Sequence, residues 1–188
     1  MRLIIMGPPG AGKGTQAARI AERYHVPAIS TGDIFRRNLA EGTPLGAQAK
    51  TYMDAGEYVP DDVTNAMVAD RLGQGDAVAG FLLDGYPRTL AQVGALDGVL
   101  VEAQLSLDAV VELTVDADVV VERLLKRAEI ESRADDNADT IRRRMEVYLA
   151  ETAPLTTEYG QRGVLLRIDG LGTMDDVTER IFAALDAL

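Results

Sequence analysis

The stretch "GPPGAGKGTQ", residues 7–16, decides the fold of this 188-residue chain. It follows the short apolar run "RLIIM" at 2–6 and leads into residues with apolar spacing typical of a helix. Strand, glycine-rich turn, lysine and helix in this order form a phosphate-binding loop (P-loop), in which backbone N–H groups and a helix N-terminus attract an anion. The stretch therefore predicts a nucleotide site, with Lys13 reaching the outer phosphates.

One residue of the loop departs from the general pattern. A Ser or Thr normally follows the lysine, whereas Gly14 stands here and Thr15 comes next. In many nucleotide hydrolases that hydroxyl binds Mg²⁺ directly, and moving it by one residue rotates it about 100° around the helix. Gly14 thus favours an enzyme that passes phosphate between two nucleotides over a switch whose loops hold the metal.

Composition indicates an ordinary globular chain with one sizeable core. Hydrophobic residues make up 47% and charged residues 26%. Cysteine is absent, which excludes disulfides and thiolate metal sites, and the net charge of −11 argues against binding to nucleic acid or to an anionic membrane. Apolar runs fall well short of the roughly 20 residues of a membrane span. We therefore predict a cytoplasmic protein.

Short apolar runs alternate with helical patterns along the chain, which predicts an α/β fold: a P-loop doubly wound parallel sheet of about five strands flanked by helices. The expected strands are 2–6, 28–30, 80–84, 108–115 and 164–169. The expected helices are 13–24, 33–41, 44–55, 61–73, 89–100, 117–129, 137–159 and 174–187. Pro154 is expected to kink or divide the helix at 137–159.

A second motif, "STGDIFRR" at 30–37, directly follows the second strand. Thr31 and Asp33 are expected to cap the next helix, and Arg36 and Arg37 lie one turn further on. Taken alone, these arginines could simply be solvated on a surface helix. Their place beyond the carboxyl end of a strand makes a phosphate site the alternative.

A third motif, "FLLDGYPRTLAQ" at 81–92, ends the third strand with Asp84. A carboxylate at the tip of a buried strand beside a P-loop is well placed to hold Mg²⁺ or its waters, although it could also cap a turn. Arg88 would project over the same edge, within reach of a phosphoryl group in transfer. Three such motifs on one sheet edge are far more specific than any one of them.

With these motifs, with Gln92, and with "RADD" followed by "RRR", the sequence resembles the adenylate kinases over nearly its whole length. In that family Gly-Lys-Gly-Thr is the normal form of the loop. The resemblance implies the reaction ATP + AMP ⇌ 2 ADP with Mg²⁺, carried out by a monomer. It also implies a helical AMP-binding insert at 30–59, a short lid at 126–136, and a core formed by 1–29, 60–125 and 137–188.

The resemblance also assigns roles to residues. Those expected at ATP are Gly10, Ala11, Gly12, Lys13, Gly14, Thr15, Arg127 and Gly172. Those expected at AMP are Thr31, Arg36, Glu57, Tyr58, Val59, Gly85, Tyr86, Pro87, Arg88, Gln92, Arg133 and Arg144. Those expected to surround the phosphates in transfer are Lys13, Arg88, Arg123, Arg133 and Arg144. Asp84 matches the carboxylate that orients the waters of Mg²⁺.

Helical geometry tests one of these assignments independently. On a helix, an apolar stripe is expected from Ile141, Met145, Tyr148 and Leu149. Arg143 then points away from the stripe, whereas Arg142 and Arg144 flank it. Geometry excludes Arg143 without choosing between the other two, and only the resemblance selects Arg144.

Some residues are interpreted without a role at the site. The acidic pairs at 61–62, 135–136 and 175–176 mostly precede helices, which suits capping and the helix dipole. Met53 and Met67 read as packing residues. Only five residues separate Arg127 from Arg133, and cysteine is absent, so structural zinc is not expected in the lid.

Two alternatives remain at this stage. A UMP or CMP kinase of the same fold tends to have Ala in place of Thr31 and Asn soon after the Pro-Arg turn, whereas here Thr89 follows the turn and Gln92 comes later. A nucleotide-binding switch without transferase activity would need one nucleotide site and no convergent Arg36, Arg88 or Arg133.

Overall fold

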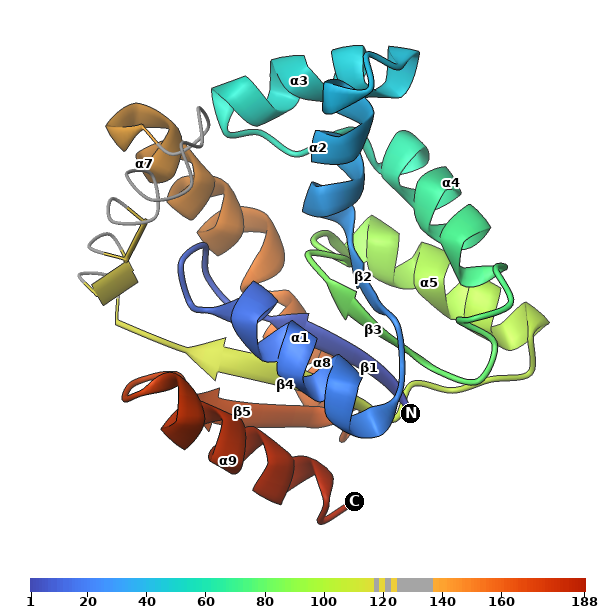
Figure 1. Ribbon diagram of the computed structural model, residues 1–188, viewed down its shortest axis with the longest axis vertical. Helices are drawn as coiled ribbons and strands as arrows, with labels where there is room; N and C mark the ends of the chain where they lie inside the picture. Colours follow the sequence, from blue (N-terminus) through green and yellow to red (C-terminus); the bar gives the residue numbers. More distant parts are fainter. Residues whose placement is uncertain (117–118, 121–122, 125–136) are drawn as a thin grey trace.

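The computed structural model describes residues 1–116, 119–120, 123–124 and 137–188. Its centre is a five-stranded, all-parallel sheet with the strand order β2-β3-β1-β4-β5, covered by helices on both faces (Figure 1). The doubly wound parallel sheet predicted from the sequence is therefore confirmed. The strands are β1 (Arg2–Met6), β2 (Ala28–Ser30), β3 (Phe81–Asp84), β4 (Ala109–Thr114) and β5 (Leu165–Asp169).

The helices agree with the periodicity of the sequence to within two residues at most of their ends. They are α1 (Lys13–Tyr24), α2 (Thr31–Ala40), α3 (Pro44–Ala55), α4 (Asp61–Leu72), α5 (Leu90–Glu102), α7 (Ala138–Val147), α8 (Leu155–Gln161) and α9 (Met174–Leu185). The helix expected at 117–129 lies partly outside the described residues, and 119–120 and 123–124 are helical.

Alternate residues of β1 build the two halves of the core. Leu3 and Ile5 face one side of the sheet, where α1 and α9 pack, and Ile4 and Met6 face the other, where α4, α5 and α8 pack. All four side chains are at most 4% exposed. Because successive strand residues point to opposite faces, burial on both sides explains why this strand is apolar throughout.

The helices α2 and α3 stand beyond the carboxyl end of β2, apart from the layers that cover the sheet (Figure 1). A small core of Phe35, Ala49 and Val59 joins them, and Val63 and Met67 of α4 also pack against it. The contact between them is close at Gly46, where a Cβ atom would lie 2.4 Å from the backbone carbonyl of Asn38. Residues 31–55 thus place two closely packed helices over the sheet edge.

The cap of α2 differs from the sequence prediction. Ser30 is the N-cap, and its hydroxyl accepts a hydrogen bond from the Asp33 backbone N–H at 3.3 Å. The prediction of Thr31 and Asp33 as caps is wrong, because each has another partner. The Thr31 hydroxyl donates to the Gly85 carbonyl at 2.9 Å, and the Asp33 carboxylate pairs with Arg36.

The helix predicted at 137–159 is divided, as Pro154 suggested. A π-helical turn, η1 (Tyr148–Thr152), follows α7, and α8 begins after Pro154. A π turn takes in one residue more than an α turn, so it rotates the side chains that follow. Tyr148 is buried whereas Leu149 is 62% exposed, so the prediction that Leu149 belongs to the apolar stripe is wrong.

Helix α9 is bonded to α1, the helix that follows the P-loop, by hydrogen bonds and an ion pair. The Gln16 amide of α1 donates to the Met174 carbonyl at 3.0 Å and accepts from the Thr178 hydroxyl at 2.8 Å. Arg19 pairs with Asp175 at 2.6 Å. Among the residues that the structure describes, no helix is long and apolar enough to cross a membrane.

Candidate active site

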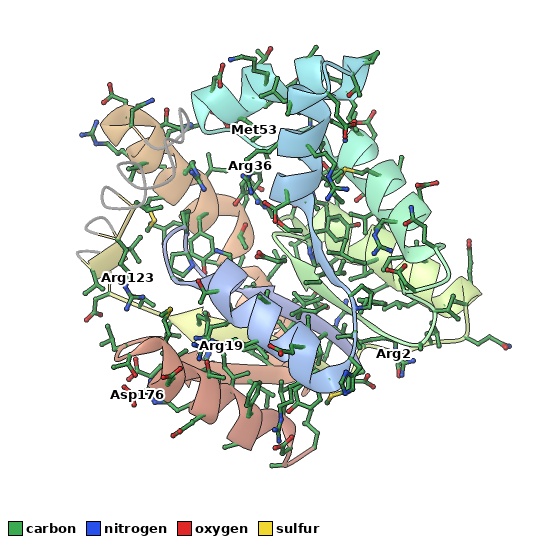
Figure 2. All side chains as sticks on the ribbon, in the orientation of Figure 1. Arg2, Arg19, Arg36, Met53, Arg123 and Asp176 are labelled. Carbon is green, nitrogen blue, oxygen red and sulfur yellow. The ribbon has the colours of Figure 1, made fainter. Side chains whose placement is uncertain are left out.

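The carboxyl edge of the sheet opens into a cleft of about 990 Å³, part of it open to solvent. It lies where β1 and β3, which are adjacent in the sheet, run out toward α2 and α7. Figure 2 labels Arg36 and Met53 on the side of the helices at 31–55 that faces α7. The cleft is lined by Lys13 and by every described residue that was predicted for AMP: Thr31, Arg36, Glu57, Tyr58, Val59, Gly85, Tyr86, Pro87, Arg88, Gln92 and Arg144.

The P-loop closes one end of this cleft. Gly12, with φ of 94°, is the N-cap of α1, and no side chain caps this helix. Gly10, with φ of 83°, also has a left-handed conformation that other residues rarely adopt. The Lys13 ammonium donates to the Gly7 carbonyl at 2.8 Å and to the Pro8 carbonyl at 2.9 Å. The uncapped helix N-terminus and this amine are the groups that bind phosphate in such loops.

Asp84 ends β3 directly beside the loop. Its carboxylate Oδ2 is 3.8 Å from the position that a Cβ atom would take on Gly14. Burial raises the pKa of the Asp84 carboxyl, while the charges of Lys13 and Arg88 act in the opposite direction. Gly14 thus leaves the space between the start of α1 and this carboxylate without a side chain.

Arg88 is held at both its backbone and its side chain. Its Nε donates to the Gly85 carbonyl at 2.7 Å, and its guanidinium carbon lies 4.8 Å from the centre of the Tyr58 ring. Its carbonyl accepts from the Thr152 hydroxyl at 2.9 Å. The same Thr152 oxygen lies 2.7 Å from the Tyr58 hydroxyl, so the π turn supports Arg88 along two routes.

Gln92 lies at the base of the cleft with only 1% of its surface exposed. Its Oε1 accepts from the Arg88 backbone N–H at 2.7 Å, and its Nε2 donates to Asp61 Oδ1 at 2.6 Å. The second oxygen of Asp61 accepts from the Thr89 hydroxyl at 2.7 Å. Asp61 lies in the first turn of α4, as the helix-dipole interpretation expected, but the capping part of that interpretation is wrong, because α4 has no side-chain cap and this carboxylate binds Gln92 and Thr89 instead.

The three consecutive arginines of α7 have different surroundings. Arg144 lines the cleft. Arg143 pairs with Glu57 at 2.7 Å and with Glu146 at 3.1 Å, and it is not among the described residues that line the cleft. Arg142 is 70% exposed and pairs with Asp139. Of the two that helical geometry left open, Arg144 is therefore the one at the cleft, as the resemblance indicated.

The other predicted residues lie elsewhere or outside the description. Arg123 donates to the Gly170 carbonyl at 3.3 Å, and Gly172 has φ of 110°; both lie near the start of α9, and neither is among the described residues that line the cleft. Arg127, Arg133 and the lid at 126–136 lie outside the described residues.

Four residues were missed or understated by the sequence reasoning. Phe35 and Met53 line the cleft, and Met53 also packs against the small core of α2 and α3, as predicted. Thr152 gave no local signal beyond its nearness to Pro154. Asp61 showed only as an acidic residue at a helix start, and no pattern in the sequence links it to Gln92.

A parallel sheet whose first strand leads through a glycine-rich loop into a helix, with a cationic cleft at the same edge, defines a P-loop nucleotide-binding protein. The family model described as adenylate kinase matches residues 5–164. The chain therefore belongs to the adenylate kinase family.

Curated relatives agree over the full length. A protein named adenylate kinase from a Nocardioides species is 64% identical over 188 residues, covering 100% of this chain and 98% of the relative. Adenylate kinases from Micrococcus luteus and Thermobifida fusca are 59% and 54% identical, each covering 98% of this chain and 90% and 98% of the relative, respectively.

Proposed function

We propose that the cleft holds AMP while the P-loop holds the phosphates of ATP, so that this chain, as an adenylate kinase, catalyses ATP + AMP = 2 ADP. The observation that carries the assignment of the sites is the convergence of Lys13, Arg36, Arg88 and Arg144 on one cleft that also contains Thr31 and Gln92. A single nucleotide site would not need a second group of cations beyond the loop.

The polar groups in the cleft suit an adenine base. The Thr31 hydroxyl donates its proton to the Gly85 carbonyl. The lone pairs of the Thr31 hydroxyl oxygen are therefore left to accept a hydrogen bond from a ligand. Gln92 retains one N–H and one lone pair beyond its bonds to protein. Apolar walls come from Phe35, Met53 and Val59. This combination of acceptors and one donor fits the amino group and ring nitrogen of adenine.

The cations suit phosphoryl transfer. The reaction requires a donor and an acceptor held in line while the charge spread over the moving group is neutralised. Arg88 is held by a hydrogen bond to the Gly85 carbonyl and by contact with the Tyr58 ring, which orients its planar guanidinium. Arg36 and Arg144 extend the positive field from α2 and α7. We assign Arg123, Arg127 and Arg133 to the same task, and Gly172 to the base of ATP, from the resemblance.

Asp84 fits Mg²⁺ held through water. A hard carboxylate oxygen beside the loop is a suitable partner, and the absent side chain at Gly14 leaves room for a hydrated ion. Among the described residues no group of three His, Cys, Asp or Glu side chains could hold a metal, so phosphates and water would supply the other ligands. When bound, the ion would neutralise charge on the phosphates.

The division into a core, an AMP-binding segment at 30–59 and a lid at 126–136 belongs to the same proposal. The close packing of α2 against α3 at Gly46 supports treating the AMP-binding segment as a unit, although Val63 and Met67 of α4 also pack against its small core. The monomeric state and the cytoplasmic location stay predictions from the sequence.

A panel of acceptors tests the function. With ATP and Mg²⁺, we expect AMP to be phosphorylated with a kcat/KM far above those of CMP, UMP and GMP. A preference for a pyrimidine acceptor would instead indicate the UMP/CMP kinase alternative. No turnover of any acceptor, with tight binding of one nucleotide, would indicate a switch.

Replacing Arg88 tests the mechanism. We expect Arg88→Ala to fold normally and to lose at least about 100-fold in turnover, the usual effect of removing a group that stabilises charge in a transition state. Arg142→Ala is the matched control, because it removes the same charge from a side chain that is 70% exposed. Near-normal turnover of Arg88→Ala would contradict the proposed role.

A further inference from the structure

The amide of Gln92 has an orientation that two protein groups fix from two sides. Its Oε1 is 2.7 Å from the Arg88 backbone nitrogen, and its Nε2 is 2.6 Å from Asp61 Oδ1. The side chain is 1% exposed, so water has little access to replace either bond. Asp61 is itself fixed, because the Thr89 hydroxyl donates to its other oxygen at 2.7 Å.

The chemistry of these two neighbours permits one orientation only. An ionised carboxylate accepts hydrogen bonds and cannot donate, whereas a backbone N–H donates and cannot accept. If the amide turned over, Oε1 would face the Asp61 carboxylate and Nε2 would face the Arg88 N–H. Both bonds would be lost and replaced by acceptor–acceptor and donor–donor contacts. The assignment of oxygen and nitrogen in Gln92 therefore follows from its partners.

A fixed amide presents a fixed pattern to the cleft. After its two bonds to protein, Gln92 has one lone pair on Oε1 and one N–H on Nε2 left over. A 6-aminopurine offers the complementary pair, an amino donor beside a ring-nitrogen acceptor. A 6-oxopurine offers the reverse, a carbonyl acceptor beside a ring N–H, and would match only the inverted amide.

We propose that Asp61 is a specificity-determining residue that acts through Gln92: by preventing inversion of its amide, Asp61 makes the cleft select 6-aminopurine over 6-oxopurine acceptors. Asp61 is not among the described residues that line the cleft, so it is a positioning residue and not a contact. The inference rests on the proposed function, in which Gln92 lies against the base of AMP.

Two acceptors that differ only at the recognised edge provide the test. IMP has the reversed donor and acceptor pattern of a 6-oxopurine but lacks the 2-amino group of GMP. A steric clash at position 2 of the base therefore cannot cause the discrimination against IMP. Initial rates with ATP and Mg²⁺ are measured for AMP and IMP in the unmodified chain, in Asp61→Asn and in Asp62→Asn. Asp62 is the matched control: it is the exposed neighbour on the same helix turn, and its replacement makes the same change in charge.

We expect the unmodified chain to prefer AMP strongly. Asp61→Asn, whose amide can accept or donate, removes one of the two restraints on Gln92 and should lower the ratio of kcat/KM for AMP to that for IMP by about tenfold or more, the factor that a hydrogen bond to a charged group supplies. Asp62→Asn should leave the ratio within about twofold, like other changes at exposed sites. An unchanged ratio in Asp61→Asn, an equal change in Asp62→Asn, or comparable use of AMP and IMP by the unmodified chain would overturn the proposal.

The ratio separates this role from a structural one. Loss of stability or a general distortion lowers the rates for AMP and IMP by the same factor and leaves their ratio unchanged. If Asp61→Asn does not fold, the side-chain amide of Gln92 is observed by ¹⁵N NMR in the unmodified chain, where slow exchange of its protons with solvent is expected and rapid exchange would overturn the proposal. This measurement does not depend on turnover, so its outcome is distinct from a failure of the proposed function.

Discussion

Replacing Thr152 with Val tests how the π turn supports Arg88. The Thr152 hydroxyl donates to the Arg88 carbonyl at 2.9 Å, so the Tyr58 hydroxyl, 2.7 Å away, must be the donor in the second bond. Thr152 is 5% exposed, which limits replacement by water. Val has nearly the same shape but neither donates nor accepts, so Thr152→Val removes both bonds while the volume stays filled.

The expected loss can be worked from these contacts. A carbonyl left without its partner in a site of low exposure costs about 1–3 kcal/mol, and the partly exposed Tyr58 hydroxyl, which can turn to water, adds about 0.5 kcal/mol. We expect Thr152→Val to lower the free energy of unfolding by about 2–3 kcal/mol. Thr152→Ser retains the hydroxyl and should cost about 1 kcal/mol for one buried methyl group.

We expect Thr152→Val to lower kcat more than Thr152→Ser does, as for stability. Arg88 would lose the bond at its carbonyl and the fixed position of the Tyr58 ring against its guanidinium. Because small displacements of a catalytic group can cost up to about 100-fold, we expect Thr152→Val to lower kcat by about 10- to 100-fold and Thr152→Ser by less than about threefold. Urea unfolding followed by circular dichroism gives the stability, and a coupled assay of ADP gives the rates. Equal effects of Val and Ser on both quantities would refute the reasoning.

Two further predictions concern Asp84 and the glycines of the helices. Burial raises the pKa of the Asp84 carboxyl in the folded protein above its value of about 4 in the unfolded chain, so ionisation of Asp84 lowers the free energy of unfolding. This loss of stability is absent below the pKa of the unfolded chain and grows as the pH rises through the pKa of the folded protein. Asp84→Asn should therefore raise the melting temperature at pH 7, with a gain that shrinks toward pH 4, while activity falls; a gain independent of pH would contradict this. Gly46→Ala should destabilise by about 3 kcal/mol, because its Cβ would meet the Asn38 backbone at 2.4 Å. Gly94→Ala on α5, with open space around it, should stabilise by about 0.5–1 kcal/mol, and the same sign for both in urea unfolding would disprove the packing argument.

Most of the fold could be predicted because its signals are local. The strands are short, apolar and bounded by turn residues, and the P-loop is recognisable from ten consecutive residues at 7–16. The position of the cleft followed from one topological rule, that the carboxyl ends of parallel strands share an edge. The residues that line it were named from the resemblance to a family, and periodicity alone reached only the exclusion of Arg143.

The remainder depends on contacts between distant parts of the chain. Thr152 bonds to Tyr58, 94 positions away, and Asp61 bonds to Gln92, 31 positions away, and neither pairing leaves a trace in local sequence. Leu149 has the spacing of the apolar stripe, yet its side chain is 62% exposed, and spacing alone does not show where such a stripe ends. The predicted caps of α2 failed because Thr31 has a competing partner in Gly85.

The contact between α9 and α1 has a consequence for synthesis of the protein on the ribosome. The helix that follows the P-loop is made well before the partners of its Gln16 amide, because Met174 and Thr178 lie 158 and 162 residues further along the chain. A growing chain therefore carries its loop sequence long before it has the helix that braces it. The Gln16 amide can form these two bonds only after translation has passed residue 178 and that segment has left the exit tunnel.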